Sequence, residues 1–335
     1  MKRILALLLA VLMICSLCAC KKDNEQNNKN TTTVNITTPD EPEDNTIVTK
    51  DSVVTPLLYK VSNKEGNYIW LFGSIHVGDD YFYPLPDYVL DAYNNADALA
   101  VECDTKAFES DTSLQTEAIL PLIYLDGTKI NDHISEETYN LGVEAMTEYG
   151  IYSQIFDFYK PIMWYSLIET TMAANSGVDA SLGIDNYFLN KAYDNDKEIV
   201  EIESVKFQYE MLANFSEDLQ IMLLEQILYY YENAPEVFEE DMISLMEMWA
   251  SGDEEGFEEY LSDDGNYKTY KEKLLYKEYN KAMITDRNIS MADFAENALK
   301  EGKVMFICVG SAHVIGDGAM ADLLAQRGYT VEIVK

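Results

Sequence analysis

The chain of 335 residues has little histidine, little cysteine and little positive charge. It contains three histidines and five cysteines, and its 24 lysine and arginine residues face 59 aspartate and glutamate residues, for a formal net charge of -35. Such an excess of negative charge argues against nucleic acid or anionic lipid as a binding partner, because their phosphates would be repelled. Acidic clusters such as residues 236–241 and 253–255 are typical of a solvated helical face.

Nucleotide-binding loop motifs are absent from the sequence, and cysteines are few. Neither a Gly-x-Gly-x-x-Gly loop nor a Gly-Lys-Ser/Thr loop occurs, so no nucleotide site is indicated. Cys15, Cys18 and Cys20 belong to the N-terminal segment. Cys103 and Cys308 fall in or beside predicted core strands, which favours small buried thiols over a disulfide. Export from the cytoplasm would permit a bridge between them, so a disulfide stays open.

The N-terminal segment has the pattern of an export signal. The apolar residues 4–18 follow a basic start and match the length of a signal-peptide core, which is too short for a comfortable membrane span. The sequence Leu-Cys-Ala-Cys at residues 17–20 resembles a bacterial lipobox. It predicts a lipoprotein signal peptide over residues 1–19 and a lipid anchor on Cys20, on the extracytoplasmic side of the cell membrane. The alternative is an ordinary secretory signal that leaves Cys20 unmodified.

A polar segment separates this signal from the globular part. Residues 20–52 are rich in Asn, Thr, Glu, Asp and Pro and contain almost no aromatic side chain. Such a segment cannot bury enough apolar surface to offset its chain entropy, which predicts a disordered tether. Residues 53–335 remain for the folded part, and a hydrophobic fraction of 47% supports a sizeable core.

Hydrophobic periodicity predicts an α/β fold with a helical middle. Strands are expected over residues 57–62, 68–72, 98–101, 198–202, 304–309 and 330–334. Helices are expected over residues 85–94, 135–150, 161–174, 183–193 and 318–326. A long helical region is expected over residues 205–299, interrupted near residues 233–235 and 262–266. Residues 63–67 carry a hairpin turn signal between the first two strands.

Two of the three histidines end near-identical motifs. Gly-Ser-Ile-His at residues 73–76 and Gly-Ser-Ala-His at residues 310–313 each follow an apolar run. An aromatic and β-branched run that ends in glycine predicts a buried strand leaving its sheet through a tight turn. His76 and His313 would then lie at the carboxyl edge of the sheet, where open α/β folds bind ligands. We therefore predict that the two histidines belong to one site.

Glu102 is the third candidate site residue, because it directly follows the predicted strand at residues 98–101. Two neutral histidines and a carboxylate suit a divalent first-row metal ion that keeps positions open for water and substrate. Glu102 would bind the ion or act as a general base, and capping of a helix N-terminus is the structural alternative. Asp104 is expected beside it, as a second ligand or as a group that orients a histidine.

These motifs, taken in chain order, resemble those of the TraB/GumN family, which includes pheromone-shutdown proteins and the Tiki group of metalloproteases. The resemblance opens with Tyr-Ile-Trp-Leu-Phe-Gly-Ser-Ile-His-Val-Gly-Asp at residues 68–79. It ends with Val-Gly-Ser-Ala-His-Val-Ile-Gly-Asp-Gly at residues 309–318 and the segment 323–331. Between them, matches occur at residues 83–86, 96–104, 183–192, 202–208 and 287–292. Together they span essentially everything from Leu57 to Lys335. The family implies a central mixed β-sheet flanked by helices with a long helical insertion, as in Tiki-, erythromycin-esterase- and ChaN-like proteins.

The resemblance also implies a site. Tiki-type members are divalent-metal-dependent peptidases whose paired histidines and a glutamate form the centre, which carries over to His76, His313 and Glu102. The same carry-over adds Arg287 as a catalytic residue, because a guanidinium there would hold a substrate carboxylate or stabilise a developing oxyanion.

The structural alternative for Arg287 is a buried ion pair with Glu203 or Asp185.

His133, the remaining histidine, precedes a predicted helix start at Ser135. It lies outside every family motif, so a loop or capping role is expected.

The sequence therefore predicts a membrane-anchored, extracytoplasmic metallohydrolase. It would use a divalent ion, Mn, Co or Zn, and cleave peptide or protein substrates, with the membrane contacted through the N-terminal lipid. One alternative is a surface lipoprotein that binds or inhibits a peptide or pheromone without cutting it. Another is a haem- or iron-binding lipoprotein, although no haem-ligation signature occurs.

Overall fold

The computed structural model describes residues 53–262 and 267–335. The predicted signal peptide, the predicted lipidation site Cys20 and the predicted tether all fall outside these described residues. Within the described ranges, no helix combines the length and the apolar character that crossing a bilayer requires.

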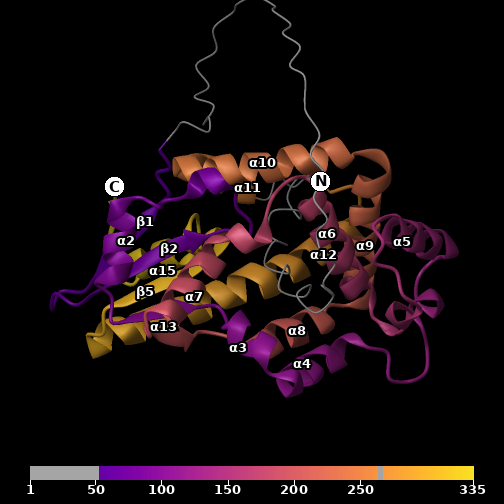
Figure 1. The fold of residues 1–335 in the computed structure, drawn as a ribbon, viewed down its shortest axis with the longest axis horizontal. Helices are drawn as coiled ribbons and strands as arrows, with labels where there is room; N and C mark the ends of the chain where they lie inside the picture. The colour runs from indigo at the N-terminus through magenta and orange to yellow at the C-terminus, as the bar shows by residue number, and fades with distance from the viewer. Residues whose placement is uncertain (1–52, 263–266) are drawn as a thin grey trace, which may run out of the picture.

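A six-stranded mixed sheet forms the centre of the fold, in the order β4-β3-β5-β2-β1-β6 (Figure 1). Its strands are β1 (Leu58–Ser62), β2 (Tyr68–Ser74), β3 (Ala98–Val101), β4 (Glu198–Glu201), β5 (Met305–Gly310) and β6 (Thr330–Val334). The four strands from β4 to β2 run parallel, whereas β1 is antiparallel to both β2 and β6. The predicted α/β fold is confirmed.

The parallel strands β3 and β5 lie in the buried centre of the sheet, whereas the antiparallel strands β1 and β2 form a hairpin. Every residue of β3 is buried, and so is every residue of β5 except Gly310. Parallel neighbours need long crossover connections, and these place helices over both faces of the sheet. The strands β1 and β2 are instead joined by the predicted turn at residues 63–67, where Gly66 takes a φ of 92°.

Helices pack around the sheet and extend into a helical part beside it (Figure 1). Helices that contact the sheet include α7 (Ile184–Asp194), α13 (Asp286–Glu301), α14 (Ser311–Val314) and α15 (Met320–Gln326). The others are α2 (Asp87–Asn94), α3 (Thr105–Ser110), α4 (Thr112–Ile119), α5 (Glu136–Glu148), α6 (Pro161–Asn175), α8 (Val205–Ala213), α9 (Glu217–Asn233), α10 (Pro235–Ser251), α11 (Glu254–Leu261) and α12 (Tyr270–Asn280). Short 3-10 helices lie at Asp80–Phe82, Leu120–Leu122, Ile130–Asp132, Gln154–Phe158 and Ala180–Leu182.

The predicted helical region over residues 205–299 contains more breaks than the two expected. Pro235 begins α10 at one predicted break, and α11 ends at Leu261 beside the other. Two further breaks occur where Ser216 caps α9 and where Gly252 ends α10 with a φ of 64°. A π-helix, η7 (Lys281–Thr285), then joins α12 directly to α13. Single capping residues end helices without disturbing the hydrophobic period, so periodicity does not reveal them.

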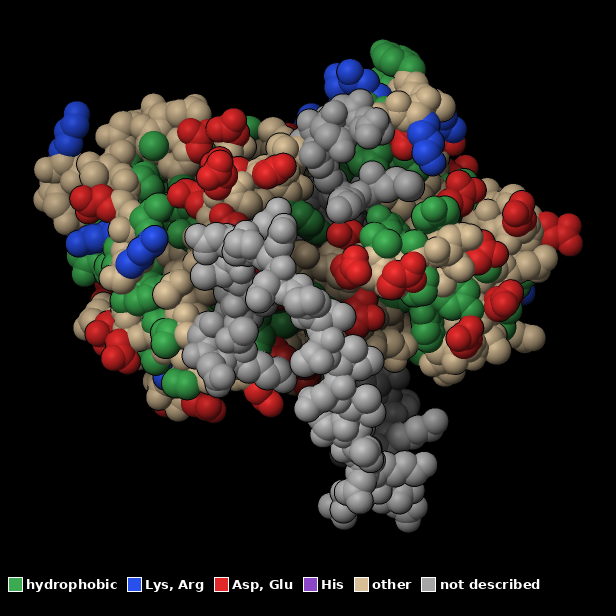
Figure 2. Space-filling view, turned by 90° about the horizontal axis from the view of Figure 1, so that it is seen from above, with side chains coloured by type: hydrophobic (Ala, Val, Ile, Leu, Met, Phe, Trp, Pro, Cys, Tyr) green, Lys and Arg blue, Asp and Glu red, His purple; other side chains and the backbone are tan. Residues whose placement is uncertain are grey.

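The surface carries the expected excess of acidic groups. Figure 2 shows Asp and Glu side chains scattered over one face of the molecule, with Lys and Arg gathered at few places. This distribution is consistent with the predicted solvated acidic faces.

One carboxyl group lies deep in the helical part. Glu169 of α6 is only 1% exposed, and no hydrogen bond reaches its Oε2 within the described residues. Burial raises the pKa of Glu169 to about 8, against a smaller opposing contribution from Tyr165. The folded state therefore keeps a proton that the unfolded chain releases above its usual pKa of 4.5. Stability should fall as the pH rises from that value towards 8.

Glu169→Gln is expected to raise the free energy of unfolding by about 2–4 kcal/mol near pH 7.5 and by little near pH 5. The amide keeps the shape of the protonated acid and has no proton to lose. Urea unfolding at the two pH values measures the difference. The exposed Glu144→Gln provides a control that should change stability by less than about 0.5 kcal/mol at either pH. An equal gain from Glu169→Gln at both pH values would contradict the assignment.

Candidate functional site

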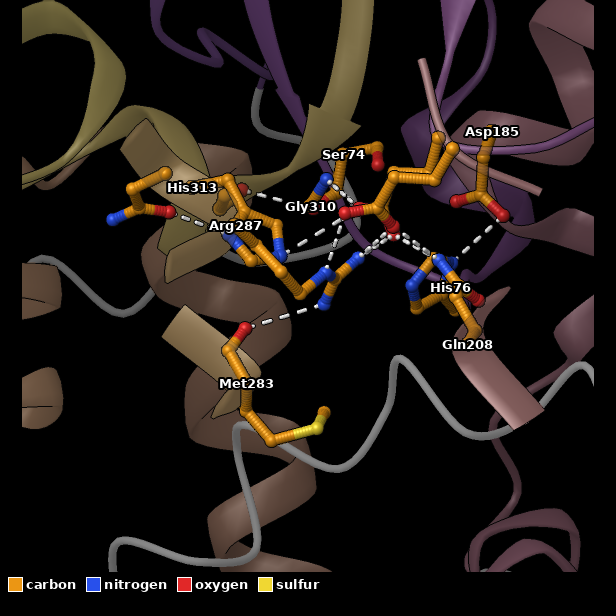
Figure 3. A network of polar contacts seen from close by, with 12 residues as sticks. Ser74, His76, Asp185, Gln208, Met283, Arg287, Gly310 and His313 are labelled. Atoms are coloured by element: carbon orange, nitrogen blue, oxygen red, sulfur yellow. Dashed lines mark hydrogen bonds and ion pairs between the residues drawn. The ribbon is translucent and has the colours of Figure 1, made fainter. Parts of the chain in front are cut away.

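The candidate site lies at one edge of the sheet. Strand β5 pairs in parallel with both β2 and β3, so the carboxyl ends of all three strands share that edge. His76, Glu102 and His313 follow these strand ends, and Arg287 reaches the same place from α13 (Figure 3). All four line one small pocket with a volume of about 40 Å³. That is room for a few waters, or for an ion with water.

His76 is held by a carboxylate. Its Nδ1 lies 2.8 Å from Oδ2 of Asp185, in the first turn of α7, and the histidine is 7% exposed. Burial alone would lower the pKa of His76, but the charge and hydrogen bond of Asp185 raise it above its usual value. Because Nδ1 is engaged by Asp185, Nε2 is the ring nitrogen left for a ligand.

His313 is held by an amide instead. Its Nδ1 lies 2.7 Å from Oδ1 of Asn288, whose amide nitrogen donates to the carbonyl of Gly318 at 3.0 Å. This second bond orients the amide, so we assign the proton of His313 to Nδ1 and the free lone pair to Nε2. Burial and the charge of Arg287 lower the pKa of His313 to about 3. The two histidines thus have the same motif but different electrostatic environments.

Glu102 is buried, and one of its carboxylate oxygens accepts two side-chain hydrogen bonds. Its Oε2 accepts from Arg287 Nη2 at 2.6 Å and from Gln208 Nε2 at 3.0 Å. Its Oε1 accepts the backbone N–H of Gly310 at 2.8 Å and lies 3.9 Å from His313 Nε2. Burial opposes ionisation, but the guanidinium of Arg287 holds the pKa of Glu102 well below its usual range. The free side of Oε1 therefore faces the histidine pocket as an anion.

Arg287 is bound by two carboxylates. Its Nε and Nη2 donate to Glu203 at 2.9 Å each, in addition to the bond from Nη2 to Glu102. Its Nη1 donates to the carbonyl of Met283 at 3.3 Å, which belongs to the π-helix η7 (Figure 3). The structure thus contains the ion pair with Glu203 that the sequence left open, whereas Asp185 binds His76. The catalytic role of Arg287 stays a prediction.

Gln208, Asp185 and Asn288 complete the site. The sequence analysis assigned no role to Gln208 or Asn288, and it considered Asp185 only as an ion-pair partner of Arg287. Gln208 Nε2 donates to both Glu102 and Glu203, at 3.0 Å each, and so bridges the two carboxylates beside Arg287. Each of the three lies within a segment that resembles the family, and this was the one available signal. Nothing in helical periodicity marks which polar side chain will turn towards a buried partner.

Close packing of the two motif turns explains their glycines. The hydroxyl of Ser311 donates to the carbonyl of Ser74 at 3.0 Å, which ties one motif to the other. A Cβ on Gly73 would lie 2.8 Å from the Ser311 hydroxyl oxygen, and one on Gly310 would lie 3.3 Å from Glu102 Oε1. Neither glycine takes a positive φ. Glycine is therefore required here by close approach of neighbouring groups and not by a positive φ.

Asp104 does not join the site, and its predicted role is wrong. Its carboxylate caps α3 by accepting the N–H of Ala107 at 3.0 Å, and it also accepts the hydroxyl of Tyr193 at 2.7 Å. Because helix α3 begins at Thr105, only three residues after Glu102, the Asp104 side chain caps the N-terminus of that helix. Cys103 and Cys308 are both buried and are not joined by a disulfide, in agreement with the favoured prediction of buried thiols.

His133 lies away from the pocket, as predicted. It ends the 3-10 helix at Ile130–Asp132, its Nδ1 lies 2.6 Å from Glu217 Oε1, and its Nε2 lies 2.8 Å from the Thr128 hydroxyl. Its ring stacks on Tyr124 with centroids 4.0 Å apart. These contacts connect a loop to α9 and leave only two histidines for the site.

The donor atoms fit a divalent ion in part. His313 Nε2 and Glu102 Oε1 are 3.9 Å apart, and two ligands of one ion with bonds of about 2.1 Å lie at most about 4.2 Å apart. Across residues 53–262 and 267–335, however, no three or more His, Cys, Asp or Glu side chains are grouped closely enough to hold an ion. A third donor, of which His76 is the candidate, requires a side-chain adjustment.

Comparison with known proteins identifies a family whose model matches this chain. The model of the TraB/PrgY/gumN family matches residues 57–333. The uncharacterized protein YbaP of Escherichia coli (strain K12) is 32% identical over 148 residues, which cover 44% of this chain and 52% of that protein. The same values hold for YbaP of Shigella flexneri. The chain thus spans about half the length of the curated relatives it matches. No solved structure matches the chain.

Proposed function

Because this chain belongs to the TraB/PrgY/gumN family, we propose that it is a metal-dependent hydrolase that cleaves peptide or protein substrates. One observation carries the proposal: each pocket histidine has its Nδ1 hydrogen-bonded, His76 to Asp185 and His313 to Asn288. Histidine ligands of metal enzymes are held in this way, since the outer bond orients the ring and makes the free nitrogen a better donor.

In this proposal each side chain has a defined part. His76 and His313 would hold the ion, Mn, Co or Zn, and Glu102 would be the third ligand or the general base. When bound, the ion would supply a Lewis acid and a water of lowered pKa. The anionic Glu102 Oε1 faces the pocket and would take the proton of the attacking water. Arg287 would keep Glu102 ionised and, as proposed, would steady a developing oxyanion.

We also propose that Cys20 carries a lipid, so that the hydrolase works on the extracytoplasmic side of the cell membrane. The lipobox-like sequence at residues 17–20 supports this placement. Substrates would then be peptides or unfolded protein segments close to that surface.

The test of the proposal combines elemental analysis with peptide digestion. The purified chain is expected to retain Mn, Co or Zn, and to cut unstructured peptides in products that mass spectrometry identifies. Chelation should abolish cleavage, and the returned ion should restore it. Cleavage that continues undiminished in fully chelated protein would contradict the metal-dependent mechanism.

Removing either outer hydrogen bond should weaken metal binding. Asp185→Ala and Asn288→Ala are each expected to lower the affinity for the ion by about 10–100-fold, because the histidine ring is no longer held in one orientation. Competition with a coloured chelator measures the affinity. Asn186→Ala is the matched control, since Asn186 lies on the same turn of α7 but bonds the carbonyl of Ala180. An unchanged affinity after Asp185→Ala would show that His76 does not bind the ion.

A binding protein that holds a peptide without cutting it is the second candidate. The observation that favours it is that Arg287 already neutralises Glu102, while the described residues offer no ready group of three metal donors. In that case substitutions of His76 and His313 would weaken peptide binding, and mass spectrometry would recover the peptide intact.

A further inference from the structure

A second and larger cavity meets the same buried ion pair. It has a volume of about 780 Å³ and is formed by residues 202–204, α8, α12 and the start of α13. Arg287 is the one residue that lines both this cavity and the histidine pocket, among the residues described. Glu203, the second carboxylate partner of Arg287, also lines it. The volume falls in the range of about 300–1,000 Å³ that is usual for small-molecule sites.

One wall of this cavity is apolar and partly open to solvent. Phe207 and Met211 are four residues apart on α8 and so lie on one helix face, and Phe215 follows beyond the end of the helix. Phe207 is 45% exposed, although it is a large aromatic side chain. An aromatic wall of this kind binds a flat or extended apolar group.

The charged groups that line the cavity are mostly acidic. Glu203, Glu278 and Asp286 supply carboxylates, and Arg287 is the only cation among the lining residues that the structure describes. The charge of Arg287 is already shared between Glu203 and Glu102, and Lys281 pairs with Asp286 from outside the lining. The carboxylates therefore outnumber the available cations, so the cavity attracts a cation and repels an anion.

We propose that this cavity is a second binding site, which takes a small amphiphilic cation with an aromatic or aliphatic body and a protonated amine. The apolar body would pack on Phe207 and Met211, and the ammonium group would lie near Glu203. Electrostatic complementarity sets this choice, because the same body with a carboxylate head would meet like charges. The inference concerns binding and does not depend on the proposed hydrolase activity.

The occupant would act on the histidine pocket through Arg287. An ammonium group at Glu203 competes with the guanidinium for that carboxylate and so strengthens the remaining bond from Arg287 to Glu102. The Oε1 of Glu102 is 3.9 Å from His313 Nε2, so the electrostatic field at this histidine changes. Coupling of this kind is reciprocal: a ligand in the histidine pocket would alter the affinity for the amine.

Calorimetric titration of the full chain with phenethylamine and with 3-phenylpropionate, which share one apolar body, tests the binding step. The amine is expected to bind saturably at one site, at least about 10-fold more tightly than the carboxylate. Phe207→Ser should weaken amine binding by a similar factor. Leu274→Ser is the matched control, because Leu274 is 47% exposed on α12 and does not line the cavity. The site is overturned if the amine fails to bind, if both probes bind equally, or if Phe207→Ser has no effect.

The three histidines provide the readout for coupling. Saturating phenethylamine is expected to shift the ring NMR signals of His313 and His76, and to leave that of His133 in place. His133 serves as an internal control because it contacts Thr128, Glu217 and Tyr124 and no residue of either cavity. Saturable amine binding without a shift of the His313 signal would refute the coupling through Arg287, although it would still support the proposed amine site.

Discussion

His313→Ala and His76→Ala are each expected to abolish metal binding and peptide cleavage, whereas His133→Ala leaves both unchanged. The physical reason is that each pocket histidine offers an oriented Nε2, and Glu102 cannot hold an ion alone while Arg287 and Gln208 occupy its Oε2. The loss should exceed the roughly 10–100-fold effect expected for the outer partners Asp185 and Asn288. Elemental analysis of the purified variants and mass spectrometry of peptide digests measure the two effects.

The control matters because the three histidines are all partly or fully enclosed. His133→Ala removes contacts with Glu217 and Tyr124, so it tests whether loss of any histidine disturbs the fold. Urea unfolding of all three variants separates loss of the ion from loss of structure. A His313→Ala protein that folds normally and still cleaves peptides at the parent rate would exclude the site proposed here.

Arg287→Met is expected to lower the free energy of unfolding by about 3–5 kcal/mol, the largest stability effect among the site residues. The guanidinium is 2% exposed and neutralises Glu102 and Glu203, which are themselves buried. Methionine fills a similar volume but leaves two like charges next to each other, with only Gln208 as a shared donor. Urea unfolding of parent and variant at pH 7 measures the difference.

The destabilisation caused by Arg287→Met is expected to depend on pH. In the parent, Arg287 lowers the pKa of Glu102, so the pair contributes stability that is present above the usual carboxyl range and is lost on acidification. In Arg287→Met the buried Glu102 should bind a proton more readily than in the unfolded chain, because it keeps its burial and loses the guanidinium. The variant is therefore expected to be less destabilised at pH 5 than at pH 7.

A matched surface substitution and a rescue complete the experiment. Arg327 also contacts two carboxylates, Glu296 and Asp293, but its side chain is 25% exposed, so Arg327→Met should cost only about 0–1 kcal/mol. Adding Glu102→Gln and Glu203→Gln to Arg287→Met removes both charges and should restore part of the lost stability. If Arg287→Met and Arg327→Met destabilise equally, burial of the charges is not the cause.

The sequence by itself determined the strands of the sheet and the edge where His76, His313 and Glu102 gather. Short apolar runs that stop at glycine or at a charged residue report where a buried strand ends, and parallel neighbours bring such ends together. The hairpin at residues 63–67 and the burial of Cys103 and Cys308 could be predicted for the same reason, since both depend on local sequence pattern. The role predicted for Asp104 was wrong because a short helix begins at Thr105, directly after this residue, which periodicity does not show.

Only the tertiary structure decided how these residues are used. The partners of the two histidines and of Glu102 are distant in the chain: Asp185 is 109 residues from His76, Arg287 is 185 residues from Glu102, and Asn288 is 25 residues from His313. A repeating pattern reports that a helix face is buried, but not which buried polar groups meet. That choice follows from packing α7, α8 and α13 against one edge of the sheet, where every enclosed charge must find a partner. For this reason two near-identical motifs contain one histidine beside a carboxylate and one beside an amide.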